Sequence, residues 1–173
     1  MKKLLIIILL ILPVLAFSQK SQINVFFDKY SGQEGYTSVY ITKYLFQMFA
    51  KISNDKEDKE FKDITSKLTS IKILTVDSAL NATKKVDFSN ELKKILPQSD
   101  YKDLLIVKDG KKTISFVIKE KNDKISELVM TISGPDSPVL IFLEGEIDLA
   151  NMSKLSKTMN IKGFEHLNDI DEK

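Results

Sequence analysis

The side chains that could perform chemistry are few, and they stand far apart in the sequence. The only histidine, His166, lies near the C-terminus, and no Gly-x-Ser-x-Gly motif occurs anywhere in the chain. Nucleophilic catalysis needs a base beside the nucleophile, most often a histidine. With one histidine and no cysteine, a transition-metal site would depend mainly on carboxylates, which such metals favour less. We therefore predict no catalytic residue, no metal site and no cofactor, and an uncharacterised hydrolase is the less favoured class.

Three carboxylates alternate near the end of the last predicted strand. Glu144, Glu146 and Asp148 would leave the same face of that strand. Such a row could attract Ca²⁺, but no Asp-x-Asp-x-Asp-Gly loop is present to supply further oxygen ligands. An acid and base pair for sugar hydrolysis straddles a cleft from different elements, so one strand is a poor source. We interpret the three carboxylates as the solvent end of a half-exposed strand.

The elements that must position these residues form a meander in the last third of the chain. Asp109-Gly110 is suited to a tight hairpin in which both central residues have positive φ. Asn122-Asp123 marks a second turn, and residues 134–138 (Gly-Pro-Asp-Ser-Pro) mark a third. Strands joined by short turns pair in an antiparallel manner. The four predicted strands cover residues 104–107, 113–119, 125–133 and 139–147.

The earlier part of the chain is mainly helical in its pattern of apolar residues. A mixed-charge run over 53–60 has no apolar residue and indicates a solvated loop or a frayed helix end. The predicted class is α+β with two layers: a mostly antiparallel sheet, including the C-terminal four-strand meander, and helices packed on one face. Predicted helices cover residues 23–30, 42–52, 61–68, 88–96 and 149–159, and predicted strands cover 37–41 and 71–76.

Alternation within the strands separates two faces of the sheet. We expect helices to cover the face with the longer apolar rows, formed by Ile114, Phe116, Ile118, Leu128, Met130, Ile132, Val139, Ile141, Leu143 and Ile147. The other face mixes polar with apolar side chains, which is typical of a docking surface for a protein, lipid or glycan. The candidate partner-binding residues on this face are Val117, Val129, Leu140 and Phe142. Two ordinary alternatives stay open: β-branched residues are common on exposed strands, and the N-terminal segment could fold over them.

A lipophilic ligand held between helix and sheet is a second hypothesis. The predicted helix over 42–52 has a wide apolar sector that includes Tyr44, Phe46 and Phe49. The alternative is plain core packing. A cavity of several hundred cubic ångströms between helix and sheet would favour the carrier. A filled core with an uncovered apolar face would favour a partner-binding module.

Composition excludes several classes of protein. The chain has no cysteine, so no disulfide and no thiolate metal site can form. Every basic residue is a lysine, and without Lys2 and Lys3 the remaining 24 lysines match 24 acidic residues. Nucleic-acid binding uses a net basic face and often arginine contacts, so we predict no nucleic-acid partner.

The first eighteen residues indicate export. Lys2-Lys3 precedes an apolar run from Leu4 to Phe17, and Ser18 completes the parts of a secretory signal peptide over 1–18. The run has fourteen residues, whereas a membrane span needs about 20, so a retained anchor is the less favoured alternative. No cysteine follows for lipidation. We expect a single domain over 19–173 that is periplasmic or secreted and soluble, without a stable membrane span after cleavage.

Five segments, in the order 37–43, 71–75, 127–130, 145–149 and 153–161, resemble the DUF4252 family of exported Bacteroidota proteins of uncharacterised function. The resemblance covers nearly the whole chain after the leader. It implies one domain in a Gram-negative envelope, and it supplies no catalytic residue. Many members look like lipoproteins, from which this cysteine-free chain departs. We expect a non-enzymatic binding or structural module of the envelope with an unknown envelope protein, or a lipophilic ligand, as its partner.

Overall fold

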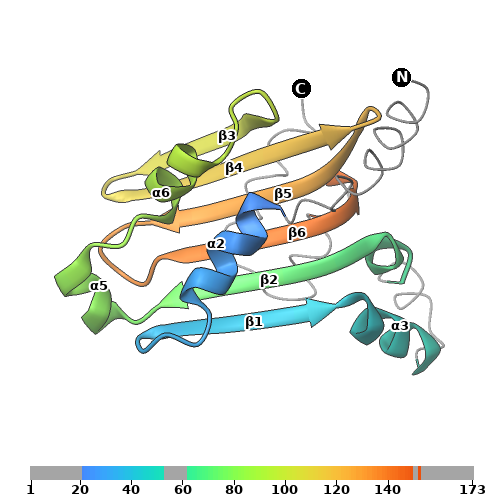
Figure 1. Ribbon diagram of the computed structural model, residues 1–173, viewed down its shortest axis with the longest axis horizontal. Coiled ribbons are helices and arrows are strands. Elements are labelled where there is room, and N and C mark those ends of the chain that lie inside the picture. Colours follow the sequence, from blue (N-terminus) through green and yellow to red (C-terminus); the bar gives the residue numbers. More distant parts are fainter. Residues whose placement is uncertain (1–20, 53–61, 150–151, 153–173) are drawn as a thin grey trace, which may run out of the picture.

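The computed structural model describes residues 21–52, 62–149 and 152, and its centre is a six-stranded antiparallel sheet (Figure 1). The strand order is β1-β2-β6-β5-β4-β3, so β1 and β3 are the edges. The strands are β1 (Tyr36–Thr42), β2 (Leu68–Val76), β3 (Tyr101–Asp109), β4 (Lys112–Lys121), β5 (Lys124–Ser133) and β6 (Val139–Ile147). The helices are α2 (Gln22–Tyr30), α3 (Lys43–Ile52), α5 (Ser78–Lys84) and α6 (Phe88–Ile95). The α+β class and the C-terminal meander are confirmed.

The two tight turns of the meander differ from each other in backbone conformation. Between β3 and β4 the loop residues are Gly110 and Lys111, and only Gly110 has positive φ, at 57°. Between β4 and β5, Asn122 and Asp123 have φ of 54° and 59°. The turn with two positive φ values was predicted at Asp109-Gly110, and it lies instead at Asn122-Asp123. Asn and Asp tolerate the left-handed region better than other residues with side chains, so the later turn can adopt it.

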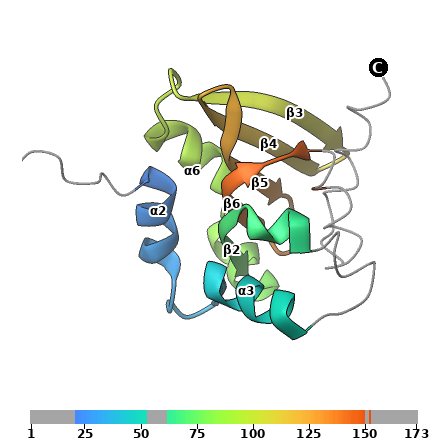
Figure 2. The same cartoon turned by 90° about the vertical axis from the view of Figure 1, so that its right-hand side faces the viewer.

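Two helices pack on one face of the sheet, which we call the helical face. Figure 2 shows α2 and α6 on the same side of the sheet. Ile23, Phe26, Phe27 and Tyr30 recur at helical spacing and are all buried, so α2 presents one apolar side to the strands. In α6, Phe88 and Leu92 are buried, and the Asp87 carboxylate caps the first turn by accepting from the Asn90 amide.

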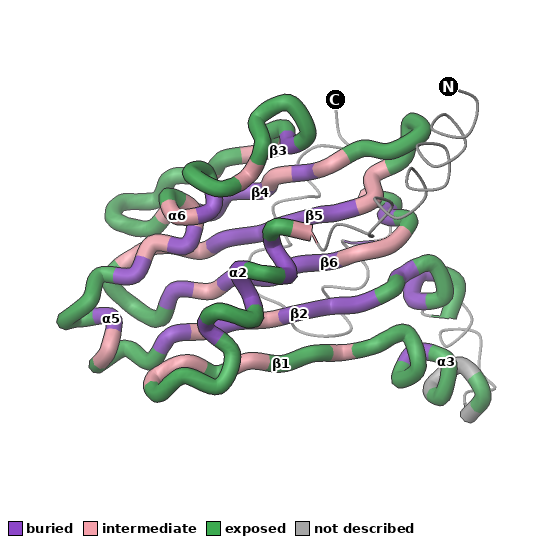
Figure 3. Tube along the Cα trace, in the orientation of Figure 1, coloured by how far each residue is buried: buried purple, intermediate pink, exposed green. Residues whose placement is uncertain are grey.

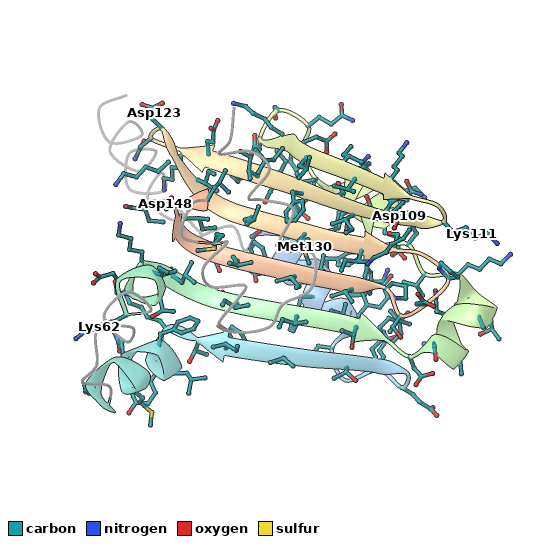
Figure 4. All side chains as sticks on the ribbon, turned by 180° about the vertical axis from the view of Figure 1, so that it is seen from behind. Lys62, Asp109, Lys111, Asp123, Met130 and Asp148 are labelled. Atoms are coloured by element: carbon teal, nitrogen blue, oxygen red, sulfur yellow. The ribbon has the colours of Figure 1, made fainter. Side chains whose placement is uncertain are left out.

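The opposite face of the sheet is buried too. Its cluster contains the apolar row that we expected to find beneath the helices, together with Phe46 of α3, Ile64 and Met152. Figure 4 views this side, with Met130 near the middle of the sheet. The predicted assignment of faces was therefore wrong: α2 and α6 pack on the face that carries Val129 and Phe142. Figure 3 shows the burial concentrated along the central strands and weak at the edges.

Helix α5 was not predicted, because it lacks an apolar stripe and its one buried residue is polar. The Asn81 side-chain amide donates to the carbonyls of Gly134, Pro135 and Asp136, and its carbonyl accepts from the Val86 amide. Asn81 thereby joins α5 to the connection between β5 and β6. This role depends on contacts distant in sequence, which no local pattern shows.

Gly145 permits a close approach between β6 and the residues before β2. Its φ is 139°, and a Cβ atom there would lie 2.4 Å from the Lys67 carbonyl oxygen. The Glu146 amide donates to that same carbonyl at 3.0 Å, beside the register shift between Leu68 and Ser70. Only glycine fits this position, because the obstacle is backbone.

Several predicted features lie outside the described residues: the leader, the charged run over 53–60, most of the helix over 149–159, and His166. Within the predicted helix over 61–68, residues 62–66 are helical. Met152 is buried, and its amide donates to the Asp148 carbonyl at 3.1 Å. Among the residues that the structure describes, no helix has the length and apolar character needed to cross a membrane.

Candidate functional site

The predicted partner-binding face is not free. Val129, Leu140 and Phe142 are 1%, 0% and 0% exposed, and they belong to one buried cluster with Ile23, Phe26 and Phe27 of α2 and with Phe88 and Leu92 of α6. Only Val117, at the margin of this cluster, is half-buried. The prediction of an exposed surface was wrong, and the alternative in which the N-terminal segment folds over these residues is the one observed. The sheet face is apolar enough to attract an amphipathic helix from its own chain.

Tyr44 and Phe46, two of the aromatic residues named in the carrier hypothesis, differ in burial. Tyr44 is 70% exposed, Phe46 is buried in the cluster of the opposite face, and the side chain of Phe49 is outside the described residues. A hollow of about 610 Å³ beside α3 is lined by Lys43, Phe46, Gln47, Lys51, Lys62, Thr65 and Ser66, and we assign no function to it.

A groove does lie between helix and sheet, but beside α6. Its larger hollow, of about 390 Å³, separates α6 from β3, β4 and β5, and Val117 and Val129 are in its wall. A smaller hollow of about 210 Å³ shares Ser89 and Lys93 with it. We call the two together the α6 groove. The larger hollow is lined by Ser89, Leu92, Lys93, Leu96, Gln98, Tyr101, Asp103, Val117, Val129 and Thr131, and the smaller by Asp87, Ser89, Asn90, Lys93, Ile106, Lys108, Thr113, Ser115 and Ser133.

The strand pairing sets the floor of the groove in rows across the sheet. Asp103 of β3 pairs with Val117 of β4, which pairs with Val129 of β5. In the next row on the same face, Ser115 lies between Ile106 and Thr131. Because side chains alternate along each strand, these two rows point to the helical face, where α6 lies above them.

The wall formed by α6 follows from helical spacing. Ser89, Lys93 and Leu96 recur at intervals of four and three residues, so they share one side of the helix. Leu92 lies between this side and the buried cluster. The floor beneath α6 carries Ser115, Val117 and Thr131, and their short side chains leave the space under the helix unfilled. The hollow thus results from side-chain size.

Most of the residues that line the smaller hollow have polar side chains. The Asp87 carboxylate accepts hydrogen bonds from the Asn90 amide at 3.1 Å, the Asn90 side chain at 2.7 Å and the Ser133 hydroxyl at 2.9 Å. Lys93 and Lys108 are exposed at its margin, and neither forms an ion pair with a described residue. A negatively charged group entering here would meet the ammonium groups of Lys93 and Lys108.

Ser115 is the unusual residue of the site. It is 2% exposed, and its hydroxyl has no hydrogen-bond partner among the described residues. A buried hydroxyl left unpaired costs about 1–3 kcal/mol, so such groups are uncommon in folded proteins. Ser115 is one of the residues that line the smaller hollow. A ligand there could restore the missing hydrogen bond.

Tyr101 lines the larger hollow and donates a hydrogen bond to the buried carboxylate of Glu127. Its hydroxyl donates to Glu127 at 2.7 Å, and the Ser21 hydroxyl donates to the same oxygen at 3.1 Å. Lys119 lies 4.0 Å from the Glu127 carboxylate and 3.4 Å from that of Asp100. Burial raises the pKa of Tyr101, and the hydrogen bond to Glu127 raises it further. Tyr101 therefore stays a neutral hydrogen-bond donor at physiological pH and links β3 to β5.

The carboxylates of the last strand have protein partners. The Ser70 hydroxyl donates to Glu144 at 3.2 Å, and Glu146 lies 2.7 Å from Lys124 and 3.7 Å from Lys67. The hydrogen bond from Lys124 lowers the pKa of Glu146. In the described part of the chain, no group of three or more acidic or histidine side chains could hold a metal ion.

The alternation of side chains correctly predicted that Val117 and Val129 share one face, but it did not predict the polar half of the site. Ser115 and Thr131 were visible as polar positions within that face, and this was the available signal. The contributions of Lys93, Lys108 and Asp87 depend on where α6 lies, which no local pattern predicts.

A family model described as "Domain of unknown function (DUF4252)" matches residues 30–155 of the chain. The described residues that line the α6 groove all fall within this range. No curated protein matches the chain, and no solved structure does.

Proposed function

This chain belongs to the family of the domain of unknown function DUF4252, and we propose that it is an exported, non-enzymatic protein that binds a small amphipathic molecule in the α6 groove. The observation that carries the proposal is the 390 Å³ hollow between α6 and the sheet. Small-molecule sites are concave, mainly apolar, and typically about 300–1,000 Å³ in volume, with a few polar groups that orient the ligand.

The composition of the wall favours an amphipathic ligand. Leu92, Leu96, Val117 and Val129 supply apolar surface in the larger hollow. Hydroxyl and charged side chains concentrate in the smaller hollow, which continues from it through Ser89 and Lys93. A molecule with one apolar part and one polar part would match both ends of the groove.

A protein partner on the same face is a weaker candidate. Val129, Leu140 and Phe142 are already in contact with helices of the same chain, so a docked protein would have to displace them. An enzymatic role has no support from residue chemistry, because no histidine is among the described residues that line the groove. We therefore propose binding without catalysis.

Export is part of the proposal and rests on residues 1–18 alone. A positively charged start followed by a short apolar run is the pattern of a cleaved secretory signal. The expected product begins at Gln19 and is found in the periplasm or the medium, free of a lipid anchor. Cell fractionation with N-terminal sequencing tests this, and intact Met1 in the cytosolic fraction would contradict it.

Binding is tested with a fluorescent dye whose emission rises in apolar surroundings, such as N-phenyl-1-naphthylamine. The purified protein should bind the dye saturably. Val117→Phe, which places a larger side chain in the groove, should abolish that binding. Val39→Phe is the matched control, because Val39 is exposed on the edge strand β1.

Two results would contradict the proposal. One is the lack of saturable dye binding by the wild-type protein, and the other is equal binding by both variants. Thermal unfolding of each variant is measured alongside, so that a loss of binding is interpreted only for a folded protein.

A further inference from the structure

We propose that the ligand of the α6 groove is a single-chain monocarboxylic acid of the fatty-acid class, with its carboxylate in the smaller hollow and its chain in the larger one. This rests on the proposed function, since it names the ligand class of the same groove. Three features of the described residues carry it: an unpaired hydroxyl, a local excess of positive charge, and the position of a repelling carboxylate.

The Ser115 hydroxyl supplies a fixed hydrogen-bond donor. It is buried and has no partner among the described residues, and Ser115 is one of the residues that line the smaller hollow. A serine hydroxyl can donate one hydrogen bond and can also accept, and a carboxylate oxygen would accept the hydrogen bond that the Ser115 hydroxyl can donate. A hydrogen bond to a charged acceptor is about twice as strong as one between neutral groups.

The charge of the smaller hollow matches one negative charge. Lys93 and Lys108 contribute two positive charges and form no ion pair with a described residue. The Asp87 carboxylate contributes one negative charge and is occupied by three hydrogen bonds from Asn90 and Ser133. The net charge of these three side chains is plus one, which a ligand with a single negative charge would neutralise. A phosphate monoester, with close to two negative charges, would add an unbalanced charge beside Asp87.

The larger hollow fixes the orientation of the ligand. Asp103 lies in its wall and is exposed there, so it would repel an acidic head group. Its apolar surface comes from Leu92, Leu96, Val117 and Val129. A hydrocarbon chain gains about 0.8 kcal/mol for each buried methylene group, which favours this hollow for the chain. Lys93 lines both hollows and would lie beside the head group at their junction.

The test is displacement of the bound dye by chain-matched competitors: dodecanoate, 1-dodecanol, methyl dodecanoate and dodecyl phosphate. Dodecanoate should displace the dye at a concentration at least about tenfold lower than the alcohol or the ester, from the strength of charge-assisted hydrogen bonds. Ser115→Ala and Lys108→Met should each weaken dodecanoate by about tenfold and leave 1-dodecanol unchanged. Lys93→Met should act likewise, whereas Lys94→Met should not, because Lys94 is exposed on α6 and does not line the groove.

The outcomes separate this inference from the proposed function. Equal displacement by acid, alcohol and ester overturns the carboxylate inference while groove binding stands. Stronger displacement by dodecyl phosphate also overturns it, in favour of a phosphate head group. Equal effects of Lys93→Met and Lys94→Met overturn the assigned position of the head group. Failure of the dye itself to bind overturns both proposals.

Discussion

The helical face of the sheet has two halves that differ in how they are filled. Under α2, bulky side chains meet: the rings of Phe26 and Phe88 lie 5.9 Å apart, those of Phe26 and Tyr30 lie 5.0 Å apart, and Phe142 is fully buried in the same cluster. Under α6 toward β3, the floor carries Val117, Ser115 and other short side chains, and the α6 groove remains open.

The two halves also treat polar groups differently. In the filled half, buried Lys72 donates a hydrogen bond to the Asn24 side chain and lies 5.3 Å from the centre of the Phe27 ring. In the open half, the buried Ser115 hydroxyl has no partner among the described residues. Buried polar groups are normally satisfied within the fold. In our proposal, the filled half serves stability and the open half serves binding.

The largest expected effect is the loss of a bulky side chain from the filled half. Phe142→Ala should lower the free energy of unfolding by about 3–5 kcal/mol, because a closely packed region cannot collapse around the cavity. Val117→Ala, on the floor of the groove, should cost about 1 kcal/mol or less, since fewer contacts are lost at a half-buried position. Urea unfolding measures both. Similar losses for the two variants would remove the distinction between the halves.

Tyr101 belongs to the buried cluster of the filled half and also lines the groove, and Tyr101→Phe should lower the free energy of unfolding by about 1.5–3 kcal/mol. The change leaves Glu127 buried with one fewer hydrogen-bond donor, and bonds to charged acceptors are worth about that much. Tyr44→Phe is the control, because Tyr44 is exposed on α3 and should change stability little. Urea unfolding at neutral pH makes the measurement. Equal stabilities of wild type and Tyr101→Phe would show that this link does not support the fold.

The raised pKa of Tyr101 also predicts a loss of stability at alkaline pH. An unfolded tyrosine releases its proton near pH 10, while the folded protein retains it, so stability falls as pH rises above about 10 and is unaffected below. Tyr101→Phe should reduce this slope by up to about 1.4 kcal/mol per pH unit. The pKa values of Tyr30 and Tyr36 are raised as well, but both residues remain in the variant. Unfolding curves across this range test the difference, and identical slopes would contradict it.

The smallest expected effect is a gain. Ser115→Ala should raise the stability of the ligand-free protein by about 1 kcal/mol, because it removes a buried hydroxyl that lacks a partner. Thr131→Val is a similar change at a buried residue, because Thr131 of β5 pairs with Ser115 and lies in the same row of the floor. Thermal unfolding without added ligand makes the measurement. A loss of stability in Ser115→Ala would mean that the hydroxyl is satisfied within the fold.

Local sequence patterns predicted much of the secondary structure. The helix predicted over 23–30 appears as α2, and the one predicted over 88–96 appears as α6. The strand predicted over 104–107 is longer than expected, because the hairpin partner β4 extends its pairing to Tyr101 and Asp109. Helix α5 was missed because Asn81 is buried by loop carbonyls, which are distant in sequence.

What the sequence by itself determined is which residues share a face, since a strand alternates its side chains and a helix repeats them about every 3.6 residues. It therefore placed Val117 and Val129 together and kept them apart from Phe116 and Met130. Only the tertiary structure decided on which face of the sheet α2 and α6 pack, and how much of that face they cover. Both faces of this sheet are apolar, so the choice depends on packing between segments distant in the chain, and the α6 groove is the region that neither helix fills.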